Sequence, residues 1–374
     1  RPTPFYLNIG DEAPPRYIYA QNWKIRSNPR FNVSLYNSGT DQRTASLEEV
    51  LCDFDEGSDL ISVKDLTCIF QKCKNMKCSA CSDRAFLLVC GNGLDAYGLL
   101  GNYIVPMFVE CGSVPDALQV FSRLVSPNEF SWTSMIQGYV ECGESQHAIT
   151  LFHMMQREDS CVDPSRFTFL AIAKACARLK HALHKGLQIH AMIVEEGYET
   201  DLFLGNTLID MYSKSGMLLE AFDVFDNLEC RDSISWNALI TGFSEQTLYE
   251  EALNFLEEMQ LQTITPDIIT FVSGLKLCGN TQRLRKGREL HSDIVRRGYG
   301  NDSFVCSALV DMYAKCASFA EAHRILEQFS GQDVVMWTSL IAGCCEYGHI
   351  EDALDFLEKM TIEGISPDVV TLMC

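Results

Sequence analysis

The best candidates for metal ligands are four cysteines, Cys73, Cys78, Cys81 and Cys90. Cys78 and Cys81 are separated by two residues, which is the spacing of many zinc ligand pairs. No second Cys-x-x-Cys pair follows, however, and the Cys73 position recurs as Cys176 and Cys278. We therefore interpret these thiols as small packing side chains, and we predict neither a metal nor another cofactor.

Histidines are the other candidates for chemistry. His349 and Glu351 form a His-x-Glu motif like that of zinc deaminases, but no Pro-Cys-x-x-Cys segment follows it. The equivalent position elsewhere reads Gly112-Ser-Val-Pro, which is typical of a turn between helices. His190 and His291 lie on apolar helix faces, where a packing histidine is far more common than a metal ligand. We predict no catalytic site in this sequence.

A long repeat explains these recurrences. Trp132, Trp236 and Trp337 lie 104 and 101 residues apart in nearly identical phrases. Asp210-Met-Tyr returns as Asp311-Met-Tyr at the same interval. Self-similarity of this kind predicts an array of small units, each packed on its neighbours, instead of one compact core.

Each long period divides into three units. Within a unit, apolar residues recur at helical spacing, as at Leu218, Ala221 and Phe225, and a glycine or small polar residue separates two helices. No segment alternates as a strand would. The sequence therefore predicts an all-α fold, an α-solenoid superhelix of antiparallel helix-turn-helix repeats. We place the units at residues 63–97, 98–128, 129–165, 166–201, 202–232, 233–267, 268–302, 303–333 and 334–368, with a partial unit at 369–374.

Residues 1–62 do not share the repeat. Their prolines and scattered Asn, Ser, Gly and Asp predict an irregular or disordered leader. The leader contains arginines and serines, as an organellar transit peptide does, but it also contains a dense acidic run at residues 48–59. Because the chain starts with Arg and not Met, we expect the natural amino terminus to lie further upstream.

Charge and hydropathy limit the partners. The formal net charge is −20 at pH 7, so bulk electrostatics cannot hold a nucleic acid, because phosphate neutralisation needs cations at the contact. No segment approaches the roughly 20 apolar residues of a membrane span. The 17 cysteines recur at helix positions, which indicates a reducing compartment and no disulfide framework. We expect a monomer without membrane contact.

Several phrases of the repeat resemble plant pentatricopeptide repeat (PPR) proteins, among them Ser235-Trp-Asn-Ala-Leu-Ile, Asp311-Met-Tyr-Ala-Lys-Cys and Glu351-Asp-Ala-Leu-Asp-Phe-Leu-Glu-Lys-Met. The alternation of short, standard and long units resembles the PLS subclass, over about residues 63–374. The resemblance implies sequence-specific binding of single-stranded organellar RNA. It further implies site recognition for C-to-U editing, or else transcript processing or stabilisation, in the mitochondrion or the chloroplast, with the mitochondrion preferred.

The resemblance also bears on enzyme activity and on protein partners. Members of the subclass often carry E and DYW domains, the latter a zinc cytidine deaminase, and this sequence contains neither. We therefore expect no enzyme activity from this stretch, and we expect editing-complex proteins as further partners.

The resemblance also assigns roles to residues. In the family, the fifth residue and the last residue of a repeat contact the base edge, and here those positions are Asn102 with Asn128, Thr133 with Ser165, Asn206 with Asp232, Asn237 with Asp267, Ser307 with Asp333 and Thr338 with Asp368. The second residue forms an apolar wedge between bases, and here it is Leu99, Phe130, Phe203, Ile234, Phe304 or Val335, with Phe167 and Ile269 in long units. Without the resemblance, packing between hairpins would explain the wedge residues equally well.

The pairing rule of the family then predicts an RNA sequence. From the 5′ end it reads pyrimidine, weakly selected purine, any base, U, U, any base, G, G, because the long units carry Leu170 and Val272 at the reading position. Lys214 and Lys315 occupy equivalent positions late in two first helices, and we predict that they contact phosphates. An arginine-rich group at residues 283–297 is more typical of a solvated outer face.

One alternative comes from a different functional class. Tetratricopeptide arrays use similar helical hairpins as protein-interaction scaffolds, and acidic surfaces are common among them. Their units keep a uniform 34-residue period. This chain instead alternates its unit lengths and ends most units with Asp or Asn, which favours RNA over a protein ligand.

Overall fold

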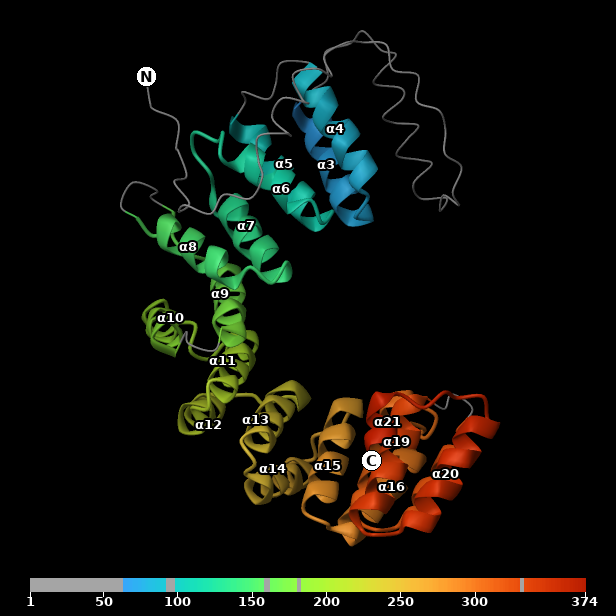
Figure 1. Ribbon diagram of the computed structural model, residues 1–374. Coiled ribbons are helices and arrows are strands. Elements are labelled where there is room, and N and C mark those ends of the chain that lie inside the picture. Colours follow the sequence, from blue (N-terminus) through green and yellow to red (C-terminus); the bar gives the residue numbers. More distant parts are fainter. Residues whose placement is uncertain (1–62, 92–97, 158–161, 180–182, 330–332) are drawn as a thin grey trace. The chain divides into compact units, whose positions relative to one another are not determined.

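The computed structural model describes residues 63–91, 98–157, 162–179, 183–329 and 333–374. The predicted leader, residues 1–62, lies outside the described residues, as do the side chains of Leu99 and Cys90. The described residues form helices and turns without any strand (Figure 1). The predicted all-α helical-repeat fold is therefore confirmed.

The helices alternate between a first and a second helix of each hairpin. The first helices are α3 (Val63–Met76), α5 (Gly98–Glu110), α7 (Glu129–Glu141), α9 (Arg166–Arg178), α11 (Leu202–Lys214), α13 (Ser233–Glu245), α15 (Ile268–Asn280), α17 (Ser303–Lys315), α19 (Val334–Glu346) and the short α21 (Val369–Met373). The second helices are α4 (Ser79–Gly91), α6 (Val114–Phe121), α8 (Ser145–Met155), α10 (Leu183–Glu195), α12 (Leu218–Asn227), α14 (Tyr249–Leu261), α16 (Leu284–Arg297), α18 (Phe319–Gln328) and α20 (Ile350–Ile362).

The chain forms two compact units, Arg1–Ala175 and Cys176–Cys374. In the first unit, α3 packs on α5 and α5 on α7, so the first helices form one layer. In the second unit, the same layer runs from α11 through α13, α15, α17 and α19 to α21. Most second helices pack on their own first helix and also on the next one, as α12 does on α11 and α13. This nearest-neighbour arrangement is what a repeat array requires.

Most of the first helices begin at an aspartate or asparagine cap. The carboxylate of Asp232, for example, accepts a hydrogen bond from the backbone N–H of Ser235 at 2.9 Å. Such a cap satisfies one of the backbone donors left open at a helix start. The residues that cap in this way are Asn128, Asp201, Asp232, Asp267, Asp302, Asp333 and Asp368. The last residue of a repeat therefore has a structural role before any ligand is considered.

The repeated tryptophans join each hairpin to the one before it. Trp132 is buried against Phe121 of α6, and Trp236 is buried against Phe225 of α12, each with ring centroids 4.7 Å apart and an edge-on geometry. The aromatic partner belongs to the preceding hairpin in both copies. Burial of these rings is a large apolar contribution at each junction.

Candidate nucleic-acid interface

At the start of most first helices, the second residue is exposed and the third residue is buried. Except for Lys64 of α3, the second residues of the first helices are apolar, and their side chains are between 55% and 74% exposed at Phe130, Phe167, Phe203, Ile234, Ile269, Phe304 and Val335. The third residues are buried in every one of these helices. The predicted wedge side chains therefore stand free of the hairpin packing, along the edge where neighbouring first helices begin.

The fifth and last residues of two repeats meet at this edge. Nδ2 of Asn206 donates to Oδ1 of Asp232 at 3.2 Å. Nδ2 of Asn237 donates to Asp267, with 3.0 Å to Oδ1 and 3.1 Å to Oδ2. The partners come from successive first helices, because each aspartate caps the helix that follows the asparagine. The two predicted pairs are thus brought together as amide–carboxylate units.

The Asn102 and Asn128 pair of the first compact unit meets differently. Oδ1 of Asn102 accepts from the backbone N–H of Asn128 at 3.0 Å, and its Nδ2 donates to the carbonyl of Ser126 at 3.4 Å. The side chain of Asn128 is itself used as a cap, accepting from the backbone N–H of Ser131 at 3.0 Å. Here the two residues are joined through the backbone.

The threonine pairs are bridged by a third hydroxyl. Oγ1 of Thr133 lies 2.7 Å from Oγ1 of Thr168, which lies 3.2 Å from Oγ of Ser165. Oγ1 of Thr338 lies 2.7 Å from Oγ1 of Thr371, which donates to Asp368 at 2.7 Å. Neither predicted pair is joined by a direct hydrogen bond among the described contacts.

The Ser307 position differs from the others. Asp333 accepts from the backbone N–H of Met336 at 2.9 Å, so it caps α19 as expected. Met336 stands where the other polar junctions have a hydroxyl, and no described contact joins Ser307 to Asp333. This is the least organised of the predicted base-reading pairs.

Hydroxyls at the third helix position are the feature that the sequence reading missed. Oγ of Ser235 donates to Oδ1 of Asn206 at 2.6 Å, and Oγ1 of Thr270 donates to Oδ1 of Asn237 at 2.7 Å. Ser131 makes the same contact with Asn102 at 2.8 Å. The sequence pattern could have indicated these hydroxyls, because Ser or Thr three residues after an Asp resembles a capping box.

The carboxylate of Asp267 is held in its ionised form. Burial raises its pKa, but hydrogen bonds from the Thr270 backbone and from the side chains of Asn237 and Thr270 outweigh this, so the net pKa is below its ordinary value. The pKa of Asp368 is also lowered, mainly by the backbone N–H of Thr371. Anionic acceptors therefore accompany the amide and hydroxyl groups at neutral pH.

The two predicted phosphate ligands are already paired. Nζ of Lys214 lies 2.7 Å from Asp210, and Nζ of Lys315 lies 2.9 Å from Asp311, in each case one helical turn earlier. Lys315 also donates to Asn280 of the neighbouring first helix at 3.3 Å. Both side chains remain about half exposed. An RNA phosphate would have to compete with a carboxylate at both positions.

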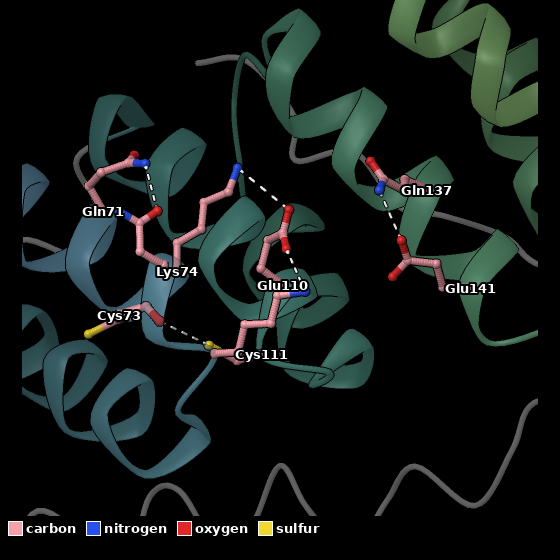
Figure 2. Close-up of polar contacts among 9 residues, drawn as sticks. Gln71, Cys73, Lys74, Glu110, Cys111, Gln137 and Glu141 are labelled. Carbon is pink, nitrogen blue, oxygen red and sulfur yellow. Dashed lines mark hydrogen bonds and ion pairs between the residues drawn. The ribbon is translucent and has the colours of Figure 1, made fainter. Parts of the chain in front are cut away.

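Lysines at the carboxyl end of α3 are likewise paired with an acid, which lies at the carboxyl end of α5. Figure 2 shows the side chain of Lys74 reaching Glu110, with 3.7 Å between Nζ and Oε1. Lys77 lies 3.8 Å from the other oxygen of Glu110. In the same view, the Cys111 thiol approaches the backbone carbonyl of Cys73 at 3.7 Å. Burial raises the pKa of Cys73 to about 12, so this thiol is a packing group and not a thiolate.

The arginine-rich group lies on α16, a second helix, and is matched by acids. Arg283 pairs with Glu250 of α14, and Arg288 pairs with Glu321 of α18 at 2.7 Å. These contacts tie successive second helices together. The group therefore belongs to the layer that does not carry the predicted wedge and base-reading residues.

The histidines are placed in packing positions. Nδ1 of His190 lies 2.8 Å from the Tyr212 hydroxyl, and Nδ1 of His291 lies 2.9 Å from the Tyr313 hydroxyl. Burial lowers the pKa of both imidazoles. Over the described ranges, no cluster of three His, Cys, Asp or Glu residues could hold a metal ion. No helix in those ranges is both long and apolar enough to cross a bilayer.

Comparison with known families identifies repeats along much of the array. A model described as "PPR repeat family" matches residues 231–280 and 332–373. A second model, described as "PPR repeat", matches residues 130–160 and 206–232. Both models match segments that contain some of the predicted base-reading positions, among them Asn206, Asn237 and Thr338.

Similar proteins occur in Arabidopsis thaliana. A pentatricopeptide repeat-containing protein is 34% identical over 282 residues, which is 75% of this chain and 38% of that protein. A relative named as chloroplastic is 34% identical over 73% of this chain and 44% of its own length. A relative named as mitochondrial is 32% identical over 75% of this chain and 44% of its own length. The chain spans less than half the length of these relatives.

The fold is similar to a solved structure. The crystal structure of the pentatricopeptide repeat protein PPR10 in complex with an 18-nt psaJ RNA element matches with a TM-score of 0.70. The match covers 88% of this chain and 51% of that chain at 18% sequence identity. At this identity the likeness shows a shared helical-repeat fold.

Proposed function

This chain belongs to the PPR repeat family, and we propose that it binds single-stranded RNA and reads its base sequence with the starts of its first helices. The observation that carries this proposal is the geometry at Asn206–Asp232 and Asn237–Asp267. Each pair places an amide and a carboxylate beside exposed apolar side chains. Such an arrangement can stack an unpaired base and contact its edge together.

The wedge residues supply affinity without positive charge. Phe203 and Phe304 expose an aromatic ring at the start of a first helix, and Ile234 and Val335 expose an aliphatic side chain there. Stacking of a base on an aromatic side chain contributes about 1–3 kcal/mol. Several such contacts can hold RNA on a protein whose net charge is −20.

The base-edge contacts supply sequence preference. An amide can donate to and accept from a base, whereas an ionised aspartate only accepts. Applied to the register of this array, the pairing rule of the family predicts the preference pyrimidine, weak purine, any base, U, U, any base, G, G. The apolar Leu170 and Val272 leave their nucleotides unselected, because they offer no hydrogen bond.

The biological setting is part of the proposal. The relatives named as chloroplastic and mitochondrial support an organelle as the location, and the PPR10 complex with an 18-nt RNA element supports an RNA ligand. The alternation of short and long units supports the PLS subclass, and through it the selection of sites for C-to-U editing together with editing-complex proteins. We expect the chain to recognise the site and another component to deaminate it.

A binding experiment tests the central proposal. The expected RNA is offered as a single strand and as a duplex, and Kd is measured for both with the purified chain. We expect tighter binding of the single strand, because paired bases cannot reach the wedge and amide groups. The double variant Phe203→Ala and Phe304→Ala should weaken this binding, whereas Val295→Ala, which truncates an exposed apolar residue of a second helix, should not.

Three results would contradict the proposal. Equal affinity for single strand and duplex would show that the bases are not read. Binding of the single strand that is indifferent to the loss of both phenylalanines would show that the wedge surface is not the contact. Deamination of the RNA by the purified chain would contradict the assignment of chemistry to another component.

A further inference from the structure

A buried hydroxyl accompanies the polar base-reading positions along the array. The third residue of a first helix is Ser or Thr where the fifth residue of the preceding first helix is Asn102, Thr133, Asn206, Asn237 or Thr338. These hydroxyl residues are Ser131, Thr168, Ser235, Thr270 and Thr371, and all are buried. Where the fifth residue is the apolar Leu170 or Val272, the third residue is Leu204 or Val305.

Two positions break this correspondence. Thr67 and Ser307 are polar fifth residues, but the third residues that follow them are Leu100 and Met336. Leu100 and Met336 are buried and have no hydroxyl to donate. The array therefore contains polar reading positions both with and without the buried hydroxyl, which makes an internal comparison possible.

At Asn237 the hydroxyl closes a ring of three side chains. Oγ1 of Thr270 lies 2.7 Å from Oδ1 of Asn237 and 2.9 Å from Oδ1 of Asp267, so its one proton is shared between these two acceptors, while Nδ2 of Asn237 donates to Asp267 at 3.0 Å. The backbone N–H of Thr270 donates to the same carboxylate at 2.8 Å. Ser235 makes the same ring with Asn206 and Asp232, at 2.6 Å and 3.2 Å.

The ring fixes which way the amide points. If the amide of Asn237 turned over, Oδ1 would face the carboxylate of Asp267, and two acceptors would repel each other. In the observed orientation, Oδ1 is occupied by the buried hydroxyl and one N–H of Nδ2 by the carboxylate. The group left to an RNA base is the second N–H of Nδ2, which is a donor.

We propose that the buried hydroxyl at the third helix position is a specificity-determining positioning residue, which holds the preceding fifth residue in the orientation that a base must match. This inference rests on the proposed RNA binding. A fixed N–H donor favours uracil, whose O4 accepts, over cytosine, whose N4 donates. Without the hydroxyl only the carboxylate of Asp267 still orients the amide, so the preference for U over C is weakened.

Loss of the hydroxyl is tested at Thr270. Thr270→Val keeps the shape and removes the donor, and Thr270→Ser restores it. We measure Kd for RNAs with U or C opposite Asn237 and, separately, opposite Asn206. Thr270→Val should lower the U-over-C ratio opposite Asn237 about fivefold, as expected for one hydrogen bond, and Thr270→Ser should recover it.

The Asn206 nucleotide is the internal control, because Ser235 is untouched in these variants. Its U-over-C ratio should stay the same if the effect is one of local positioning. Ser145→Ala removes a buried hydroxyl on a second helix that has no hydrogen-bond partner among the described residues, and it should leave both ratios unchanged.

Gain of the hydroxyl is tested at Met336. Met336→Thr places a donor after Ser307, and base selectivity opposite Ser307 should rise toward that opposite Thr338. An unchanged U-over-C ratio in Thr270→Val, or unchanged selectivity in Met336→Thr, overturns the inference while leaving RNA binding intact. A wild-type chain without affinity for single-stranded RNA overturns the proposed function and this inference together.

Discussion

Asn206 and Asn237 occupy the same place in successive repeats, and each is paired with an aspartate. At the residue scale, this pairing predicts that base choice can be rewritten. The double variant Asn206→Thr and Asn237→Thr creates the threonine–aspartate pairing already present at Thr338 and Asp368. We expect its preference to move from UU toward GG, while the two downstream nucleotides keep their G preference. Competition binding with matched oligonucleotides measures the change.

The result of this experiment distinguishes recognition of RNA bases by the two asparagines from a purely structural role in the fold. Both asparagines are more than nine-tenths buried in the free chain, so they could serve the fold alone. If the double variant still prefers UU, the asparagines are structural and the assigned site is wrong. A melting temperature for each variant shows that a lost preference does not reflect unfolding.

Buried histidines predict a pH dependence of stability. Burial holds the pKa of His190 and His291 below the ordinary value of 6.5, with a further lowering of His291 by Arg324. As the pH falls, the unfolded chain therefore takes up protons at these two histidines before the folded chain does. The stability that comes from keeping the two imidazoles neutral is thus present above pH 6.5 and is lost below it. We expect the melting temperature to drop between about pH 7.5 and about pH 5.5.

The variants His190→Gln and His291→Gln, combined, should flatten this dependence, because glutamine does not titrate and can still bond to the tyrosine hydroxyls. An unaltered slope in the double variant would mean that other groups cause the pH dependence.

The sequence was informative about which residues lie together in the candidate site, and less so about their contacts. Family resemblance points to Asn237 and Asp267, and the structure places them 3.0 Å apart. It does not point to Thr270, because a hydroxyl three residues after an aspartate is explained by helix capping alone. Its bond to Asn237 depends on how two helices 33 residues apart in sequence are placed side by side, and local patterning does not contain that information.

At the scale of elements, close approach of first helices depends on glycine. Gly242 of α13 faces Ser213 of α11, and an added Cβ at Gly242 would overlap the Ser213 side chain. We predict that Gly242→Ala forces the two helices apart and lowers the free energy of unfolding by about 1–3 kcal/mol. Chemical denaturation monitored by circular dichroism measures this loss.

Gly300 is the matched control for that substitution. A Cβ added there would meet only a Val295 methyl, at 4.0 Å, so Gly300→Ala should change the unfolding free energy little. If Gly242→Ala is equally harmless, the layer of first helices is looser than the structure indicates. Helical spacing in the sequence predicts that α11 and α13 are helices, but it does not show that Gly242 is their point of contact.

At the scale of the whole molecule, charge and ligand are in apparent conflict. The net charge is −20, yet the proposed ligand is a polyanion. The conflict is resolved if stacking and base-edge contacts, and not phosphate contacts, hold the RNA. The arginines of α16 do not alter this, because Arg283 and Arg288 already pair with acids on neighbouring second helices.

This balance predicts a shallow salt dependence. For single strands, the logarithm of affinity falls with the logarithm of salt concentration with a slope of about −0.7 per neutralised phosphate, so two lysines give about −1.4. The double variant Lys214→Gln and Lys315→Gln should bring the slope close to zero. Phe203→Ala should weaken binding without changing the slope, since stacking releases no counterions. A slope several times steeper than about −1.4, or a slope that the two lysines do not affect, would show that phosphate contacts elsewhere on the chain dominate and that the first-helix edge is not the main RNA surface.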